Sequence, residues 1–168
     1  GRVISMLSKM IKPKQILEIG TYTGYSAICW AEGLVAGGMV HSIDINEEIK
    51  DMVDRYMEEA GIRNNVTQYI GNALSIIPQI NETFDIVYID ADKENYSNYF
   101  DEVIDKVHAG GFIIADNVLW SGKVLEASDT MDEDTEALVA YSKKIREDDR
   151  VENVLLPIRD GLLVARKK

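Results

Sequence analysis

The segments FDIVYIDADK (residues 84–93) and GFIIADN (residues 111–117) are two apolar runs that end in acid at the same relative place. Each is typical of a buried strand that stops on a carboxylate. The first stops at Asp90 and the second at Asp116, with Asn117 directly after it. In an open α/β sheet, the carboxyl ends of the strands form the ligand crevice. If the two strands are neighbours, we expect these three side chains to converge there.

This convergence predicts a metal site with a basic group beside it. Asp90, Asp116 and Asn117 offer the carboxylate and amide oxygens that hard cations such as Mg²⁺ and Ca²⁺ prefer, and Lys93 follows Asp90 by three residues. Taken singly, Asp90 could instead cap a helix, and Asp116-Asn117 could form a turn. Three oxygen ligands together with a lysine favour an enzyme site over these local roles.

Outward from these two segments, strand patterns alternate with helix patterns along the chain. Strands are expected over residues 15–19, 39–45, 66–70, 84–89, 111–115, 151–157 and 162–165. Helices are expected over residues 3–11, 25–35, 47–60, 73–80, 96–107 and 135–146, and a loop over residues 117–129. This alternation predicts an α/β fold with a doubly wound, mostly parallel sheet.

The last two expected strands have a different connection. They leave no room for a helix between them, so we expect an antiparallel hairpin at the end of the chain. Neither a linker nor a repeat interrupts the pattern, and 168 residues suit one core. Residues 1–168 are therefore predicted to form a single domain.

Composition and charge exclude several classes of protein. Lys and Arg number 18 against 29 Asp and Glu, and the net charge of −11 argues against a broad nucleic-acid surface. No apolar run approaches the roughly 20 residues needed to span a bilayer. The start GRVISMLSKM lacks the apolar core of a secretory signal, and its first residue is Gly, so an N-terminal segment is expected to be missing. The single cysteine, Cys29, suits a reducing cytoplasm.

The segment ILEIGTYTGYSA (residues 16–27) places two glycines, Gly20 and Gly24, between the first strand and the first helix. Glycines at this turn let the backbone approach a ligand closely. The spacing is not the dinucleotide fingerprint G-x-G-x-x-G, and a tight turn without a ligand is the alternative. The glycine pair alone is therefore a weak signal.

Further residues at the same edge of the sheet strengthen the prediction. Asp44 lies about twenty residues after the glycine turn, the offset at which an acid meets ribose hydroxyls. Glu18, an acid within an apolar strand, needs a cationic or hydrogen-bonding partner, and an amino-acid ammonium would fit. Ala73 follows the third strand, where an adenine edge could be met. Together these residues favour a nucleoside with a positive amino-acid tail over NAD.

The chain resembles a known family in six motifs. They are ILEIGTYTGYSA, SIDIN, GNAL, FDIVYIDADKENY, ADNVLWSGKV and PIRDGLLVARKK. In this order they look like the class I S-adenosylmethionine-dependent O-methyltransferases, specifically the caffeoyl-CoA and catechol O-methyltransferase group with its bacterial members. The resemblance covers essentially the whole chain. It implies a Rossmann-like, seven-stranded sheet of order 3-2-1-4-5-7-6 with strand 7 antiparallel, a homodimer, and N-terminal helices ahead of this sequence.

The resemblance also implies roles for individual residues. Cofactor binding is expected from Glu18, Gly20, Tyr22, Ser26, Asp44, Ala73 and Asp90. Glu18 and Gly20 would meet the methionine part, Asp44 the ribose and Ala73 the adenine. A divalent metal, Mg²⁺ with Ca²⁺ or Mn²⁺ as alternatives, would be held by Asp90, Asp116 and Asn117. Lys93 would act beside the acceptor hydroxyl, either as base or as charge stabiliser, and Asp90 would border both sites.

The predicted function is that of a cytoplasmic, metal-dependent O-methyltransferase with a small catechol- or caffeoyl-type acceptor. Three protein oxygens on a cation that prefers about six leave room for both oxygens of a vicinal diol and water. Trp120, in the loop after the metal pair, is the candidate for an aromatic wall on the acceptor. Two alternatives stay open. One is a tRNA hydroxyuridine O-methyltransferase, which the net charge disfavours, and the other is a nucleoside-binding module without catalysis.

Overall fold

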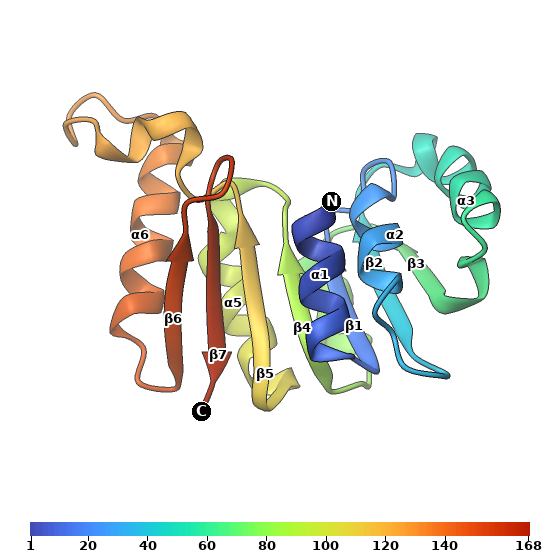
Figure 1. Ribbon diagram of the computed structural model, residues 1–168. Helices are drawn as coiled ribbons and strands as arrows, with labels where there is room; N and C mark the ends of the chain where they lie inside the picture. The colour runs from blue at the N-terminus through green and yellow to red at the C-terminus, as the bar shows by residue number, and fades with distance from the viewer.

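The computed structural model describes all residues, Gly1–Lys168, and its centre is a seven-stranded sheet of order β3-β2-β1-β4-β5-β7-β6 (Figure 1). The strands are β1 Gln15–Ile19, β2 Met39–Asp44, β3 Val66–Ile70, β4 Phe84–Ile89, β5 Val107–Asp116, β6 Val151–Leu156 and β7 Leu162–Lys167. Strand β7 is antiparallel to both of its neighbours, β5 and β6, whereas the other pairs are parallel. The predicted fold class, strand order and terminal hairpin are confirmed.

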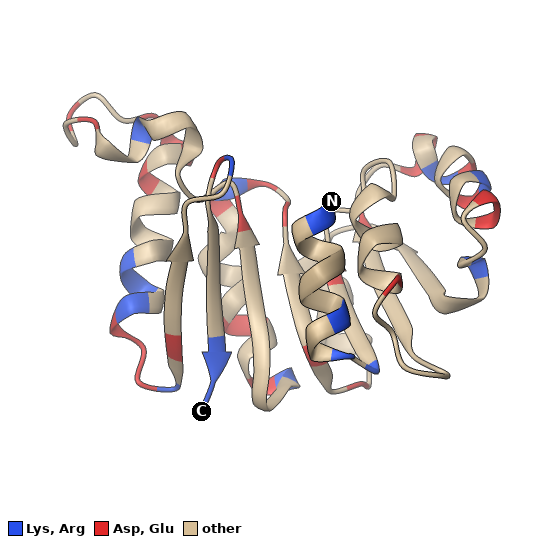
Figure 2. Ribbon diagram, in the orientation of Figure 1, with Lys and Arg blue, Asp and Glu red and all other residues tan.

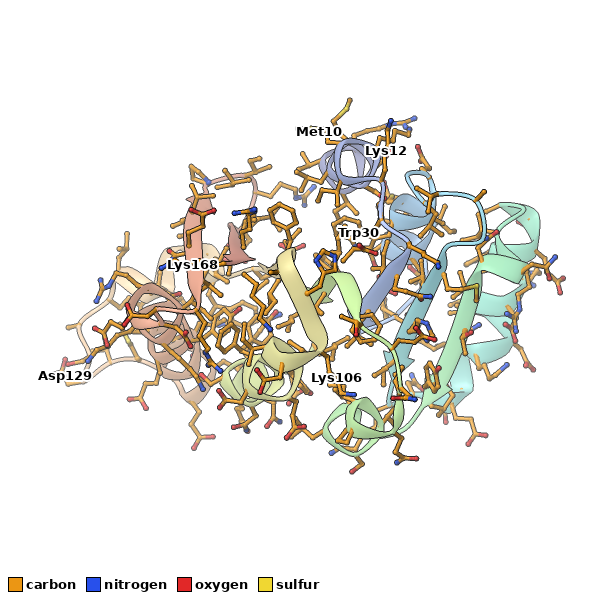
Figure 3. All side chains as sticks on the ribbon, turned by 90° about the horizontal axis from the view of Figure 1, so that it is seen from below. Met10, Lys12, Trp30, Lys106, Asp129 and Lys168 are labelled. Atoms are coloured by element: carbon orange, nitrogen blue, oxygen red, sulfur yellow. The ribbon has the colours of Figure 1, made fainter.

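Six α-helices cover the two faces of the sheet. They are α1 Arg2–Ile11, α2 Tyr25–Ala31, α3 Lys50–Glu59, α4 Ala73–Ile76, α5 Tyr96–Val103 and α6 Glu133–Glu147. Helices α1, α2 and α3 share one apolar cluster with the sheet, and α4, α5 and α6 share the other. Figure 3 looks along the strands and shows side chains filling both layers, with Trp30 between α1 and the sheet. No helix combines the length and the apolar character needed to cross a bilayer.

The observed elements differ from the expected ones mainly where short 3₁₀ turns occur. These turns are Glu47–Ile49, Arg63–Asn65, Ile77–Gln79, Lys93–Asn95, Ile104–Lys106 and Trp120–Leu125. The helix expected over residues 96–107 ends as α5 at Val103, and β5 already begins at Val107. This strand was expected to begin at Gly111, but β5 begins four residues earlier, so that both Gly110 and Gly111 lie inside it. There the β4–β5 register shifts, so the glycines mark a bulge.

Backbone hydrogen bonds continue past the ends of the strands at the carboxyl edge of the sheet. Gly20 donates its N–H to the Ile43 carbonyl at 2.9 Å, and Asp90 donates to the Ile19 carbonyl at 2.9 Å. These two bonds hold the chain after β1 against the ends of β2 and β4, the two strands that pair with β1. Gly20 has φ +101°, and a Cβ built on it would lie 2.0 Å from the Asp90 carbonyl oxygen. Only glycine suits this position.

We expect Gly20→Ala to lower the free energy of unfolding by about 3 kcal/mol, because it combines a disfavoured φ with a backbone collision. Gly37→Ala is the matched control. Gly37 has φ +74°, but no heavy atom lies within 4 Å of its built Cβ. The control should therefore lose only about 1 kcal/mol. Urea unfolding measures the free energy of unfolding of both variants. Equal losses in the two variants would contradict a backbone collision at residue 20.

Candidate active site

A cavity of about 340 Å³ lies at the carboxyl ends of β1, β2 and β4. Its walls are Ile19, Gly20, Tyr22, Ile43, Asp44, Ile45, Gly71, Asn72, Ala73, Asp90, Ala91, Asp92, Asn95 and Tyr99. Five of the seven residues predicted to bind the cofactor are among them, whereas Glu18 and Ser26 are not. The structure thus brings the ends of three strands and the turn after β3 around one space, at the edge of the sheet where the sequence predicted a ligand.

Glu18 is fully buried in β1, behind this cavity. Ser42 on β2 donates a hydrogen bond to its Oε2, while its Oε1 has no hydrogen-bond partner. Burial raises the pKa of Glu18 to about 7, the hydroxyls of Ser26 and Ser42 oppose this effect, and the charges of Asp90 and Asp44 add to it. The sequence predicted a cationic or hydrogen-bonding partner for this acid, and Ser42 supplies a hydrogen bond to one oxygen while the other has no partner.

Asp44 shapes the loop that follows β1. Its Oδ2 accepts the N–H of Tyr22 at 2.7 Å, and its Oδ1 accepts the N–H of Asn46 at 2.8 Å. Tyr22 therefore lies on the cavity wall with φ +44°, and its side chain is 74% exposed. The sequence placed Tyr22 along the turn, which is correct, but nothing in the pattern indicated that its ring would face solvent.

The two acid-ended strands are neighbours. Ile89 on β4 pairs with Ala115 on β5, so both strands reach the same edge together. Figure 2 shows acidic residues, in red, at the adjacent carboxyl ends of β4 and β5. The Lys93 Nζ lies 3.3 Å from Asp90 Oδ1 and 3.4 Å from Asn117 Oδ1. The expected pairing of the two acid-ended strands is confirmed, and Lys93 lies between the two strand ends.

Lys93 is only 6% exposed and contacts two aromatic residues. Its Nζ donates to the Tyr96 hydroxyl at 2.5 Å, and that hydroxyl donates to the Asp116 carbonyl at 2.9 Å. The Nζ also lies 4.6 Å from the centre of the Tyr96 ring and 5.5 Å from that of Trp120. The i, i+3 spacing of Tyr96 from Lys93 was the available signal in the sequence for this contact.

Tyr88 is the other residue whose role the sequence did not show. Its hydroxyl donates to Asp116 Oδ2 at 2.5 Å, and its ring packs edge-on against Trp30 with centroids 5.4 Å apart. Burial and the Asp116 carboxylate raise the pKa of Tyr88, so the phenol keeps its proton and donates. Tyr88 lies in β4 two residues before Asp90, which follows the strand directly, and this alternate spacing was the available signal.

The donor set at this edge suits a hard divalent cation. Two carboxylates and one amide oxygen are the ligand types that Mg²⁺ and Ca²⁺ prefer. Burial raises the pKa of Asp90, Lys93 opposes this effect, and the charge of Asp116 adds to it. A cation between the carboxylates would relieve that repulsion. The ammonium of Lys93 next to Asp90 and Asn117 shows that the position already accommodates positive charge.

The sequence matches a known family over its whole length. The model of the O-methyltransferase family matches residues 1–168. Among curated proteins, the chain is similar to caffeoyl-CoA O-methyltransferase 5 of Nicotiana tabacum, with 34% identity over 99% of this chain and 74% of that protein. It is also similar to caffeoyl-CoA O-methyltransferase of Petroselinum crispum, with 35% identity over 99% of this chain and 74% of that protein.

Solved structures share the fold. An O-methyltransferase from Bacillus cereus, solved in complex with SAH, is 31% identical with a TM-score of 0.93, covering 99% of this chain and 80% of that one. The O-methyltransferase TomG from Streptomyces achromogenes, solved in complex with SAM, is 26% identical with a TM-score of 0.93. The match covers 99% of this chain and 78% of that one. Each of these alignments covers 99% of this chain and therefore includes the residues of the cavity and of the acid-ended strands.

Proposed function

The chain belongs to the S-adenosylmethionine-dependent O-methyltransferases of the caffeoyl-CoA type, and on this premise we propose that it methylates one hydroxyl of a small vicinal aromatic diol. The observation that carries the proposal is the position of Asp90. This residue lines the 340 Å³ cavity and also lies 3.3 Å from Lys93 in the cluster with Asn117. Methyl donor and acceptor would therefore meet at Asp90.

The cavity suits S-adenosylmethionine in its chemistry. The related structures from Bacillus cereus and Streptomyces achromogenes were solved with SAH and SAM. In this chain, the unpartnered Glu18 Oε1 would accept the methionine ammonium, which supplies the cation that the buried carboxylate lacks. Asp44 would take the ribose hydroxyls and Ala73 the adenine edge, with Gly20, Tyr22 and Ser26 along the intervening turn.

The acceptor hydroxyl must be activated as a nucleophile, because a free phenol has a pKa near 10 and ionises little at neutral pH. A bound divalent cation, Mg²⁺ in our proposal, supplies charge stabilisation for the acceptor oxygen. Asp90, Asp116 and Asn117 would hold that cation. The caffeoyl-CoA O-methyltransferase relatives support a phenolic acceptor, and the net charge of −11 favours a small molecule over tRNA.

Lys93 would hold its positive charge beside the acceptor oxygen. The ammonium has acceptors on Asp90, Asn117 and Tyr96 and faces two aromatic rings, all of which stabilise the charged form. As the methyl group moves from sulfur to oxygen, the sulfur becomes neutral and the acceptor proton leaves to solvent. Tyr96 keeps the ammonium in place by accepting one of its hydrogens.

Methyl transfer to a 3,4-dihydroxyphenyl compound tests the proposal. We expect a chelator to lower the rate at least about 100-fold and Mg²⁺ to restore it, because the donor set needs its cation. Asp116→Ala should lose a similar factor without recovery in Mg²⁺, and a 4-hydroxyphenyl analogue should be a poor acceptor. Asp101→Ala, which removes an exposed carboxylate paired with Lys144 on the surface, is the control and should stay active. Full activity with chelator and in Asp116→Ala would exclude the metal role.

A further inference from the structure

Tyr88 contacts Asp116 in a way that packing alone does not require. The ring is 1% exposed and fills the layer under α1 beside Trp30, a place that phenylalanine would fill equally well. The hydroxyl adds only its hydrogen bond to Asp116 Oδ2, at 2.5 Å. This bond joins a rigid core side chain to a carboxylate at the edge of the site.

The carboxylate of Asp116 is held from two sides. Oδ2 accepts from the Tyr88 hydroxyl, and Oδ1 accepts from the N–H of Asn117 at 2.7 Å. With one bond to each oxygen, the plane of the carboxylate cannot turn without breaking one of them. Asp90 differs, because its side chain is 39% exposed and its bond to Lys93 is 3.3 Å long.

We propose that Tyr88 is a positioning residue that sets the metal preference of this site, biasing it toward Mg²⁺ and away from Ca²⁺. The inference rests on the proposed metal-dependent function. Mg²⁺ demands a near-ideal octahedron with single-oxygen contacts, whereas Ca²⁺ accepts flexible, irregular and two-oxygen carboxylate contacts. A carboxylate with a fixed plane and an occupied second oxygen suits the first ion better than the second.

The test is calorimetric titration of metal-stripped protein with MgCl2 and, separately, with CaCl2. Tyr88→Phe is expected to weaken Mg²⁺ binding about 10- to 100-fold, as loss of a bond to a metal ligand generally does. The Kd for Ca²⁺ should change by less than about threefold, because a freed Asp116 can meet this ion with both oxygens. The ratio of the Ca²⁺ Kd to the Mg²⁺ Kd should therefore fall at least about threefold.

Tyr141→Phe is the matched control. Tyr141 is also fully buried, but its hydroxyl has no hydrogen-bond partner, so its loss should leave both dissociation constants unchanged. Thermal unfolding of the metal-free variants verifies that both are folded. If Tyr88→Phe is less stable, the same titrations are made below its unfolding temperature, with the wild type at that temperature as reference.

The outcomes separate the inference from the function on which it rests. Equal weakening for both metals, or no change for either, would overturn the selectivity role of Tyr88 and leave the metal role intact. If the wild-type protein binds neither metal, even with SAH present, the metal-dependent function fails and the inference fails with it. A lowered ratio in Tyr88→Phe together with an unchanged ratio in Tyr141→Phe supports the proposal.

Discussion

Replacing Lys93 with methionine is expected to lower kcat for methyl transfer about 10³-fold, while the affinities for S-adenosylmethionine and for the metal stay within about threefold. Methionine keeps an unbranched apolar side chain but removes the charge that faces the rings of Tyr96 and Trp120. Stopped-time assays with a catechol acceptor give kcat, and calorimetry gives the two affinities. A variant with wild-type kcat would show that Lys93 has no part in the reaction.

Lys93→Arg separates the two roles that the sequence left open. Arginine keeps the positive charge but does not accept a proton at neutral pH. Because Lys93 lies between the oxygens of Asp90 and Asn117, we expect charge stabilisation to dominate and arginine to recover at least about tenfold of the loss. If both variants bind cofactor and metal but are equally inactive, Lys93 acts as the proton acceptor instead.

The second large effect concerns Glu18. Glu18→Gln is expected to weaken S-adenosylmethionine binding about 100-fold, because the ammonium loses the buried carboxylate that would neutralise it. The same variant should make the cofactor-free protein more stable at pH 8. Glutamine has nearly the same shape and can keep the bond to Ser42, but it carries no charge into the core. A gain in stability with a loss of binding distinguishes a ligand-binding acid from a structural one.

The direction of the pH dependence follows from the raised pKa of Glu18. Burial shifts it from 4.5 to about 7, so the folded protein binds the proton more tightly than the unfolded chain. Stability from this group is complete below pH 4.5 and is lost as the pH rises toward 7. The difference corresponds to about 3 kcal/mol, since one pKa unit is equivalent to about 1.4 kcal/mol.

Thermal unfolding of wild type and Glu18→Gln between pH 5 and pH 8 checks this prediction. The advantage of the variant should be small at pH 5 and should grow to about 3 kcal/mol at pH 8. Saturating S-adenosylmethionine should reverse the order, because only the wild type gains from the ammonium. Parallel stability curves for the two proteins would contradict a buried, unpartnered carboxylate.

The sequence predicted the fold well because its signals are local. The apolar runs that end at Asp90 and Asp116 mark strands, and alternation with helices determines a parallel sheet. Boundaries were less accurate where the signal was ambiguous. The Gly110-Gly111 pair resembles a turn that would begin the fifth strand, but backbone pairing across a bulge places both glycines inside β5.

The candidate site was predicted only in part. The strand-end acids and Lys93 were visible because a carboxylate at the end of an apolar run is costly without a purpose. The parts played by Tyr88 and Tyr96 were not visible, since an aromatic residue in a strand or helix face usually belongs to the core. Each does belong to the core here, and only its hydroxyl reaches the site.

By itself, the sequence determined which residues are chemically competent and on which strand each acid ends, because periodicity and turn residues act over a few positions. The resemblance implied that β4 and β5 are neighbours, but only the tertiary structure decided that this pairing brings the Lys93 Nζ within 3.4 Å of Asn117 Oδ1. It also decided that Glu18 is left without a cation. These contacts join residues far apart in the chain, and their energies depend on burial and distance, which exist only once the sheet has assembled.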